Sequence, residues 1–373
     1  MKNGFKVIDG DGHMLEPLDI WDKYTEPAFK DRAPKVIGHV NRMLVKYGPC
    51  ESFPEGNAQP RPESVYSDLE DRYGEAYRSW WSLPSRIVHM DQEGVDIQVN
   101  FRTAGGAAIS PNITDSKLQA ALCRAYNNWA TEFSQESSGR VQFVAQVTML
   151  DVNDSVEEIQ RIGNRPEVTA INIPDPGSER QWSDDEFAPL WQHLQEKNLA
   201  ACFHGGGSQR QVFGKMKGSL SAVSHAMSFP LDAMVSMGTM IFGSVLENNP
   251  NLRCAFFEAN AGWLPFWLAR LDDHAIGRQG RFMYGHSLPL KPSEYFTRQC
   301  FVACDADEGT LSFVADYMQG ENLIFNTDYP HADALFPGAV DMFLERDLSN
   351  ESRKKILWDN SIALYGERVR AGN

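Results

Sequence analysis

The feature that most constrains the fold of this chain is an alternation of short apolar segments with amphipathic ones. Eight apolar segments have the length of buried strands, and most precede a segment with helical periodicity. The predicted strands are residues 5–9, 96–101, 141–149, 168–173, 199–203, 252–257, 301–304 and 323–325. The predicted helices are residues 85–94, 116–134, 155–162, 185–196, 230–247, 264–274, 310–318 and 351–364. Such alternation predicts parallel strands, and eight of them favour a closed (β/α)8 barrel of the TIM type over an open sheet. The rival doubly wound sheet lacks support, since no GxGxxG follows the first strand.

Residues 14–84 depart from this alternation. They are rich in proline and carry scattered aromatic residues, including Trp80 and Trp81. We interpret them as a long insertion after the first strand that covers the barrel mouth, within one domain spanning residues 1–373. The insertion has more aromatic residues than are needed to cover one barrel mouth, so we predict a homodimer or a heteromer with a related subunit.

Ionisable side chains follow several of the predicted strands. They are Asp11, His13, His204, Glu258, Asp305 and Asp328. Catalytic residues of a (β/α)8 barrel lie at the C-terminal ends of its strands. Buried carboxylates and imidazoles need partners, and a shared metal ion would satisfy them together. The sequence therefore predicts a metal site at this end of the barrel.

Composition limits the partners and the compartment. The chain of 373 residues has a formal net charge of −15, which argues against a nucleic-acid or anionic-membrane partner. Its six cysteines form no CxxC pair, and neither a signal region nor a membrane-spanning apolar run is present in the sequence. We expect a small-molecule substrate, no nucleic acid, no membrane, and a cytoplasmic location.

Four motifs carry a resemblance to a known family. They are DGDGHMLEP at residues 9–17, FHGGG at 203–207, EANAGWLPFWL at 258–268 and NTDYPH at 326–331. The chain resembles the amidohydrolase superfamily, in the branch of aminocarboxymuconate-semialdehyde decarboxylase. This resemblance implies metal ligands at four positions, namely Asp11, His13, His204 and Asp328. The chain departs from the family pattern with carboxylates at Asp11 and at Glu258, where histidines are usual.

The number of metal ions sets the expected chemistry. A single ion would be held by Asp11, His13, His204 and Asp328, with zinc as the expected metal. The ion would activate a water molecule, and Asp328 would orient that water or take its proton. If Glu258 and His225 also bind metal, the site is dinuclear, and manganese or iron becomes the expected cofactor.

The remaining candidates have two interpretations each. Glu16 is either a further ligand or a partner of backbone amides, and His225 is either a second-metal ligand or a substrate contact. Glu258 is a metal ligand or an acid–base group, and His331 braces the ligands around Asp328. Arg102 either meets a substrate carboxylate or forms an ordinary salt bridge. We place Asp328, Glu258 and His225 in the catalytic set.

We therefore expect a metal-dependent hydrolase or lyase that acts on a small organic substrate. Amide hydrolysis, C–C cleavage and decarboxylation all fit the predicted site. Two alternatives remain open at this point. One is a dinuclear manganese- or iron-dependent monooxygenase, and the other is a non-catalytic subunit of a heteromer.

Overall fold

The structure, a computed structural model, describes residues 1–40, 44–56, 68–205, 221–276 and 288–370. Its centre is one parallel sheet in the order β1-β4-β5-β6-β7-β8-β9-β10. These strands are β1 (Ile8–His13), β4 (Ile97–Phe101), β5 (Val141–Gln146), β6 (Val168–Asn172), β7 (Ala200–His204), β8 (Cys254–Phe257), β9 (Cys300–Asp305) and β10 (Leu323–Asn326). Backbone hydrogen bonds join the two ends of the sheet, from Asp328 N to Asp11 O (3.0 Å) and from His13 N to Tyr329 O (2.6 Å). The sheet thus curls into a nearly closed barrel, and the predicted (β/α)8 fold is confirmed.

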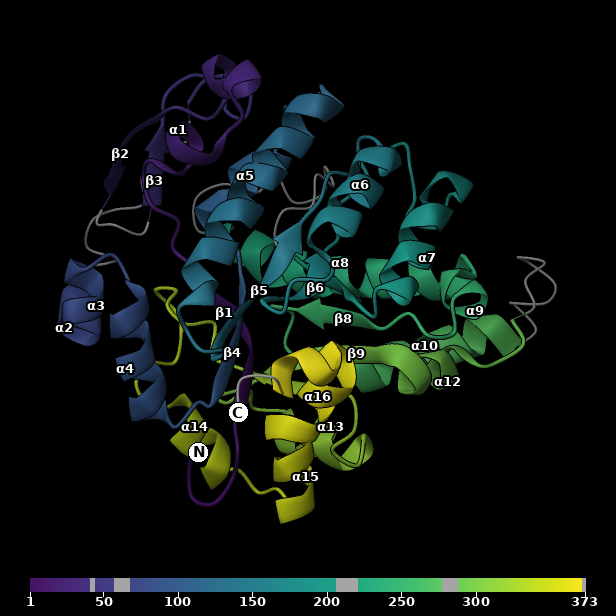
Figure 1. The fold of residues 1–373 in the computed structure, drawn as a ribbon. Coiled ribbons are helices and arrows are strands. Elements are labelled where there is room, and N and C mark those ends of the chain that lie inside the picture. Colours follow the sequence, from purple (N-terminus) through teal and green to yellow (C-terminus); the bar gives the residue numbers. More distant parts are fainter. Residues whose placement is uncertain (41–43, 57–67, 206–220, 277–287, 371–373) are drawn as a thin grey trace.

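Helices surround these strands (Figure 1). The longer ones are α4 (Leu83–Glu93), α5 (Ser116–Gln135), α6 (Val152–Ile162), α7 (Ala188–Glu196), α8 (Ser221–Phe242), α10 (Leu264–Ile276) and α12 (Pro292–Gln299). The shorter ones are α9 (Val245–Asn248), α13 (Leu311–Tyr317), α14 (Ala339–Glu345), α15 (Asn350–Lys354) and α16 (Asn360–Tyr365). Within the described ranges, no helix is both long and apolar enough to cross a bilayer.

Local sequence signals explain several helix ends. Asp115 caps α5 by accepting hydrogen bonds from the backbone amides of Lys117 and Leu118. Gly94 ends α4 with a φ of 78°, as its left-handed preference predicts. The prediction that Pro230 begins the next long helix is wrong, because α8 already starts at Ser221 and Pro230 lies inside it. The apolar periodicity on which the prediction rested lies after Pro230, so it did not indicate that the helix begins before this residue.

Two apolar clusters hold the barrel together. The larger one lies between the strands and the helices. The smaller one includes Val99, Val144, Ala255 and Ile324 from the strands, and Tyr365 from α16 packs against it. The side chains of this smaller cluster are almost fully buried, so the barrel interior is a packed core and only the strand ends are free for chemistry.

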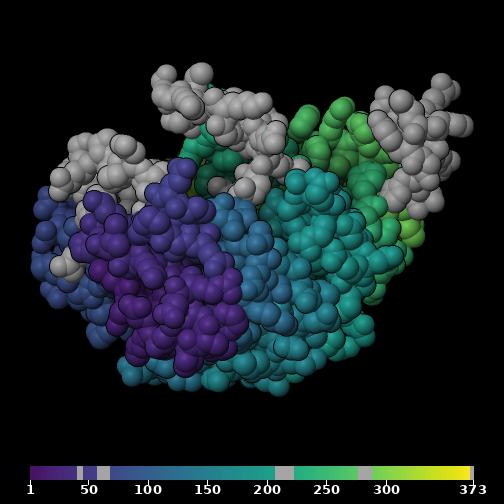
Figure 2. All heavy atoms as spheres, turned by 90° about the horizontal axis from the view of Figure 1, so that it is seen from above, coloured from purple at the N-terminus to yellow at the C-terminus, as the bar shows by residue number. Residues whose placement is uncertain are grey.

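The segment after β1 contains short elements. They are α1 (Ile20–Tyr24), the antiparallel strands β2 (Val36–Val40) and β3 (Leu44–Tyr47), α2 (Leu69–Tyr73) and α3 (Glu75–Arg78). Figure 1 places α1, β2 and β3 beside α5, and Figure 2 shows the first residues of the chain gathered on one side of the molecule. The hydroxyl of Tyr73 donates to His331 O (3.0 Å), so α2 contacts the loop that follows β10.

The aromatic residues behind the predicted dimer have partners within the chain. Trp81 is 1% exposed and packs in a cluster with Tyr73. The indole of Trp80 donates a hydrogen bond to Glu16 O (3.1 Å). The homodimer or heteromer therefore stays a prediction. The aromatic residues that suggested it already have packing and hydrogen-bond partners inside one subunit.

Candidate metal centre

Strand ends that lie far apart in the sequence bring acidic and histidine side chains together. His13, the last residue of β1, occupies the middle of the group. Its Nε2 lies 3.1 Å from Asp328 Oδ1, 3.4 Å from Glu258 Oε1 and 3.6 Å from Asp11 Oδ1. One imidazole thus faces three carboxylates that come from β1, from the end of β8 and from the end of β10.

Two further histidines complete the group. The Nε2 of His204, at the end of β7, lies 3.3 Å from Asp11 Oδ1, and its Nδ1 lies 3.5 Å from Glu258 Oε2. His331 Nδ1 lies 3.0 Å from Asp328 Oδ1. These donor atoms form two overlapping sets with metal-binding spacing, one of His13, Glu258, Asp328 and His331 and one of Asp11, His13 and His204. We call these six side chains the strand-end cluster.

The backbone around the cluster fixes its side chains. Glu258 and Asp328 have φ values of 52° and 55°, in the left-handed region that residues other than glycine rarely adopt. Such conformations at a site turn a side chain in a direction that regular strand geometry would not allow. His13 Nδ1 lies 2.9 Å from Arg102 O. That carbonyl can only accept, so Nδ1 carries the proton and the Nε2 lone pair of a neutral His13 faces the carboxylates.

Several atoms of the cluster fit a cation better than any protein partner. Both carboxylate oxygens of Asp11 are buried without a hydrogen bond within the described part of the chain, and so are both ring nitrogens of His204. The same holds for His13 Nε2 and Asp328 Oδ1. Buried polar atoms are normally paired, and imidazole and carboxylate are the groups that bind divalent metals. The donor set therefore fits one shared divalent ion.

Burial and charge shift the pKa values of these groups in different directions. Burial lowers the pKa of His204 to about 3, so its imidazole is neutral at physiological pH. Burial raises the pKa of Asp11 well above its usual range, and the Glu258 and Asp328 carboxylates add to this rise. Burial alone would lower the pKa of His13, but Asp328 and Glu258 outweigh it and raise that pKa. Without a cation, the cluster relieves its negative charge by holding protons.

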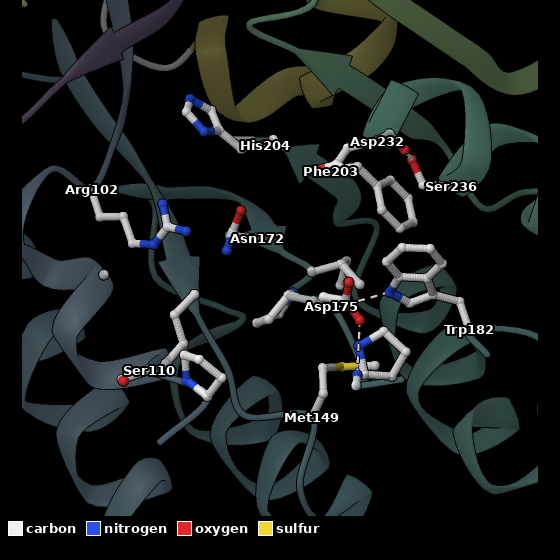
Figure 3. Close-up of a pocket in the computed structure, with 18 of the residues that line it drawn as sticks. Arg102, Ser110, Met149, Asn172, Asp175, Trp182, Phe203, His204, Asp232 and Ser236 are labelled. Atoms are coloured by element: carbon white, nitrogen blue, oxygen red, sulfur yellow. Dashed lines mark hydrogen bonds between the residues drawn. The ribbon is translucent and has the colours of Figure 1, made fainter. Parts of the chain in front are cut away.

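A cavity of about 430 Å³ opens beside the cluster (Figure 3). Its wall includes His204 and Phe257 at the ends of β7 and β8, and Asn172 at the end of β6. Arg102, which directly follows β4, points into it (Figure 3). This size and this place at the C-terminal ends of the strands are typical of a site for a small molecule.

Arg102 brings a positive charge to this cavity. Its Nε is buried and has no hydrogen-bond partner among the described residues, and no salt bridge is formed there. Burial lowers the pKa of its guanidinium, although the nearby Glu258 partly opposes this. The ordinary salt bridge considered for Arg102 is therefore absent from the described structure.

Two of the predicted site residues lie outside the strand-end cluster. Glu16 accepts hydrogen bonds from the backbone amides of Thr103 (3.0 Å) and Ala104 (2.7 Å), so it holds a loop. His225 is exposed on α8, with its ring 4.9 Å from that of Phe229. Neither metal-competent set in the described residues includes Glu16 or His225, and a ligand role for either residue stays a prediction.

Sequence reasoning missed the cavity wall that faces Arg102. Asp175 and Trp182 belong to the loop that follows β6, and Met149 lies just beyond β5. The turn sequence Pro174-Asp175-Pro176 directly after a predicted strand was the available signal, because active-site loops leave the barrel strands at this end. In the motif at 203–207, residues 206 and 207 lie outside the described residues.

Parallel barrel strands with a buried set of metal-binding side chains at their C-terminal ends define a metal-dependent (β/α)8 enzyme. A family model described as amidohydrolase matches residues 8–366. The chain therefore belongs to the amidohydrolase family, as its motifs predicted.

Individual relatives point to the decarboxylase branch. The chain is 21% identical over 290 residues to a 2-amino-3-carboxymuconate-6-semialdehyde decarboxylase of Dictyostelium discoideum, covering 77% of each chain. It superposes on an amidohydrolase from Mycobacterium avium subsp. paratuberculosis with a TM-score of 0.77 and 20% identity, covering 97% of this chain and 100% of the other. A 5-carboxyvanillate decarboxylase from Novosphingobium aromaticivorans, complexed with manganese and 4-hydroxy-3-methoxy-5-nitrobenzoic acid, gives 0.69 and 18%, covering 98% and 97%. These relatives give no support to the monooxygenase alternative.

Proposed function

We propose that this enzyme is a metal-dependent decarboxylase of a small organic acid. The observation that carries this proposal is Arg102, which lines the cavity beside His204 and whose buried Nε has no hydrogen-bond partner among the described residues. A desolvated guanidinium nitrogen without a hydrogen-bond partner is costly, so the cavity favours a ligand with a negative group. Arginine binds carboxylates through paired, charge-assisted hydrogen bonds. A substrate carboxylate bound by Arg102 would lie next to the strand-end cluster, and the decarboxylase names of the relatives support this reaction.

The metal would be held by Asp11, His13, His204 and Asp328. Because His13 Nε2 belongs to both donor sets and binds one ion at a time, we favour a single divalent ion. When bound, the ion supplies Lewis acidity that stabilises negative charge developing on a substrate oxygen. Zinc was the expectation from the donor types, whereas the manganese in a relative favours that metal here.

Side chains of the protein would then transfer the proton that the reaction needs. Breaking the bond to the departing carboxyl group leaves an electron pair on carbon, which must take up one proton as CO2 leaves. The side chains of Asp328 and Glu258 are 24% and 18% exposed, in contrast to Asp11 at 1%, so these two carboxylates are more accessible than Asp11. His331 Nδ1 lies near both oxygens of Asp328, at 3.0 and 3.1 Å. We assign proton transfer to the Asp328–His331 pair and a supporting electrostatic role to Glu258.

The test of this proposal measures CO2 release. Metal-loaded protein is assayed on 5-carboxyvanillate and on a panel of hydroxybenzoic acids. The variant Arg102→Met should lower kcat/KM by about a hundredfold or more, because it removes a desolvated charge-assisted contact. Arg102→Lys is the matched control that keeps the charge and should recover part of the loss. Hydrolysis of amides in place of CO2 release, with no effect of Arg102→Met, would overturn the assignment.

The number and kind of metal ions are tested separately by elemental analysis. With one ion, His204→Ala should lower metal content, and Glu258→Gln should keep about one equivalent. Loss of one of two equivalents in Glu258→Gln would show a dinuclear site instead, with Glu258 and His331 as ligands of the second ion. Turnover that needs iron or manganese and consumes oxygen at an oxygen electrode would establish the monooxygenase alternative.

A further inference from the structure

The cavity continues well beyond the place where a carboxylate would meet Arg102. Figure 3 shows Arg102 on one side and Trp182 on the opposite side, with Met149 between them at the base. Ile173 and Phe203 also line this second part. These four apolar residues are at most 6% exposed, and together they give the cavity an apolar wall.

Hydrogen bonds and ring packing hold this wall in place. The indole nitrogen of Trp182 donates to Pro174 O (3.0 Å), and its ring packs edge-on against Phe203 with centroids 5.5 Å apart. Phe203 in turn stacks on Phe256 at 5.3 Å. The wall is therefore preformed, and an apolar group could bind there without first ordering the loop.

The side of the cavity near Trp182 carries a carboxylate, unlike the side of Arg102. Asp175 lies near Trp182 in Figure 3, and its Oδ1 accepts a hydrogen bond from Gly177 N (2.8 Å). Asp232 adds a second carboxylate to the lining. The guanidinium of Arg180 also lines this side, but it donates twice to Pro176 O (3.0 and 2.7 Å) and lies 3.7 Å from Glu186. A second anionic group at this side of a ligand would meet the carboxylate of Asp175 and an arginine that already has partners.

We propose that the substrate is an amphipathic monocarboxylic acid whose apolar body extends from Arg102 to the wall of Met149, Ile173, Trp182 and Phe203. This inference rests on the proposed function, because it takes the carboxylate at Arg102 as its starting point. It adds a selectivity that the reaction type does not imply. The cavity should favour acids with a long or multi-ring apolar body over compact acids, and monoanions over dianions of the same length.

The test uses simple acids as binding probes and needs no turnover. Isothermal titration calorimetry on the protein as purified with its metal measures dissociation constants for n-alkanoates from butanoate to decanoate. Each added methylene that reaches the wall should tighten binding by about fourfold. The α,ω-dicarboxylates of equal chain length should bind about three- to tenfold more weakly than the monocarboxylates.

Variants separate the two parts of the cavity. Trp182→Leu should reduce the gain per methylene, and Ala233→Leu, which fills space in the lining, should weaken only the longer acids. Arg102→Met should weaken all chain lengths by a similar factor and leave the gain per methylene in place. Phe313→Ala is the control for loss of an aromatic group, because Phe313 is 63% exposed on α13 and should change neither quantity. Circular dichroism checks that each variant is folded.

Each outcome decides between the two proposals. Equal affinity for short and long alkanoates, or for monocarboxylates and dicarboxylates, overturns the inference about the cavity even if the enzyme releases CO2 from a compact acid. A gain per methylene that depends on Trp182, without CO2 release from any acid tested, supports the apolar cavity and overturns the decarboxylase assignment instead.

Discussion

Acidification should destabilise this protein partly through one half-buried histidine. His89, on α4, has its Nδ1 2.8 Å from the hydroxyl of Tyr329 and packs against Phe336, with ring centroids 4.5 Å apart. Burial, assisted by the positive charge of Arg86, lowers the pKa of His89 to about 4. In the unfolded chain the pKa returns to its ordinary value of about 6.5. Between these two values, the unfolded chain binds a proton that the folded protein does not.

The sign and size of the effect follow from this difference. Because the unfolded state binds more protons, the free energy of unfolding rises with pH across this window. The contribution of His89 is fully present above about pH 6.5 and is lost as the pH falls through about 4. The shift corresponds to at most about 3.4 kcal/mol, and the part of the ring that remains in water reduces the expected effect to about 1–2 kcal/mol.

The assay compares urea unfolding of the parent protein and His89→Gln at several pH values between neutrality and pH ~4. Both proteins are kept in the same metal state, so that titration of the strand-end cluster cancels in the difference. The parent should lose about 1–2 kcal/mol more stability than His89→Gln over this range. His39→Gln is the matched control, because the side chain of His39 is exposed. Parallel curves for the parent and His89→Gln would refute the reasoning.

Two further predictions concern residues that support the strand-end cluster. Asp9→Asn should weaken metal binding by about ten- to a hundredfold, measured by competition titration with a chelator. The reason is that Asp9 accepts hydrogen bonds from Thr327 N (3.0 Å) and Thr327 Oγ1 (2.6 Å), next to the loop that carries Asp328. An unchanged metal affinity would contradict this role. Gly105→Ala should lower stability by about 1–3 kcal/mol in chemical denaturation, because its Cβ would lie 2.7 Å from both Glu16 Oε1 and a ring carbon of Tyr126; a variant as stable as the parent would show that this loop relaxes freely.

The strand-end residues could be predicted from the sequence because one rule locates them. Once eight strands are recognised, the C-terminal ends of a parallel barrel must lie at the same side, and polar residues there stand out against apolar strands. This reasoning selected Asp11, His13, His204, Glu258, Asp305 and Asp328, and the structure places all of them except Asp305 in one cluster. Asp305 instead accepts a hydrogen bond from Asn260 Nδ2 (2.6 Å). The rule needs only the order of the strands and no knowledge of distant contacts.

Other features depended on contacts that no local pattern encodes. Glutamate is a common metal ligand, but the carboxylate of Glu16 accepts hydrogen bonds from backbone amides 87 and 88 residues further along the chain. A bulge in β1 between Asp9 and Gly12 breaks the simple alternation of strand side chains. Asp9 consequently bonds to Thr327 and Gln98, although strict alternation would have put it on the same face as Asp11. Tertiary contacts decide these positions, and a single sequence does not reveal them.

The span of the strand-end cluster along the chain has a consequence for biosynthesis. Its donors run from Asp11 to His331, and Asp9 fastens β1 to Thr327, which follows the last strand. During translation, the first ligands leave the ribosome long before their partners exist, and contacts of such large sequence separation form late in folding. Metal uptake should therefore follow completion of nearly the whole barrel. A nascent or truncated chain that stops before β10 would carry Asp11 and His13 without the site that they belong to.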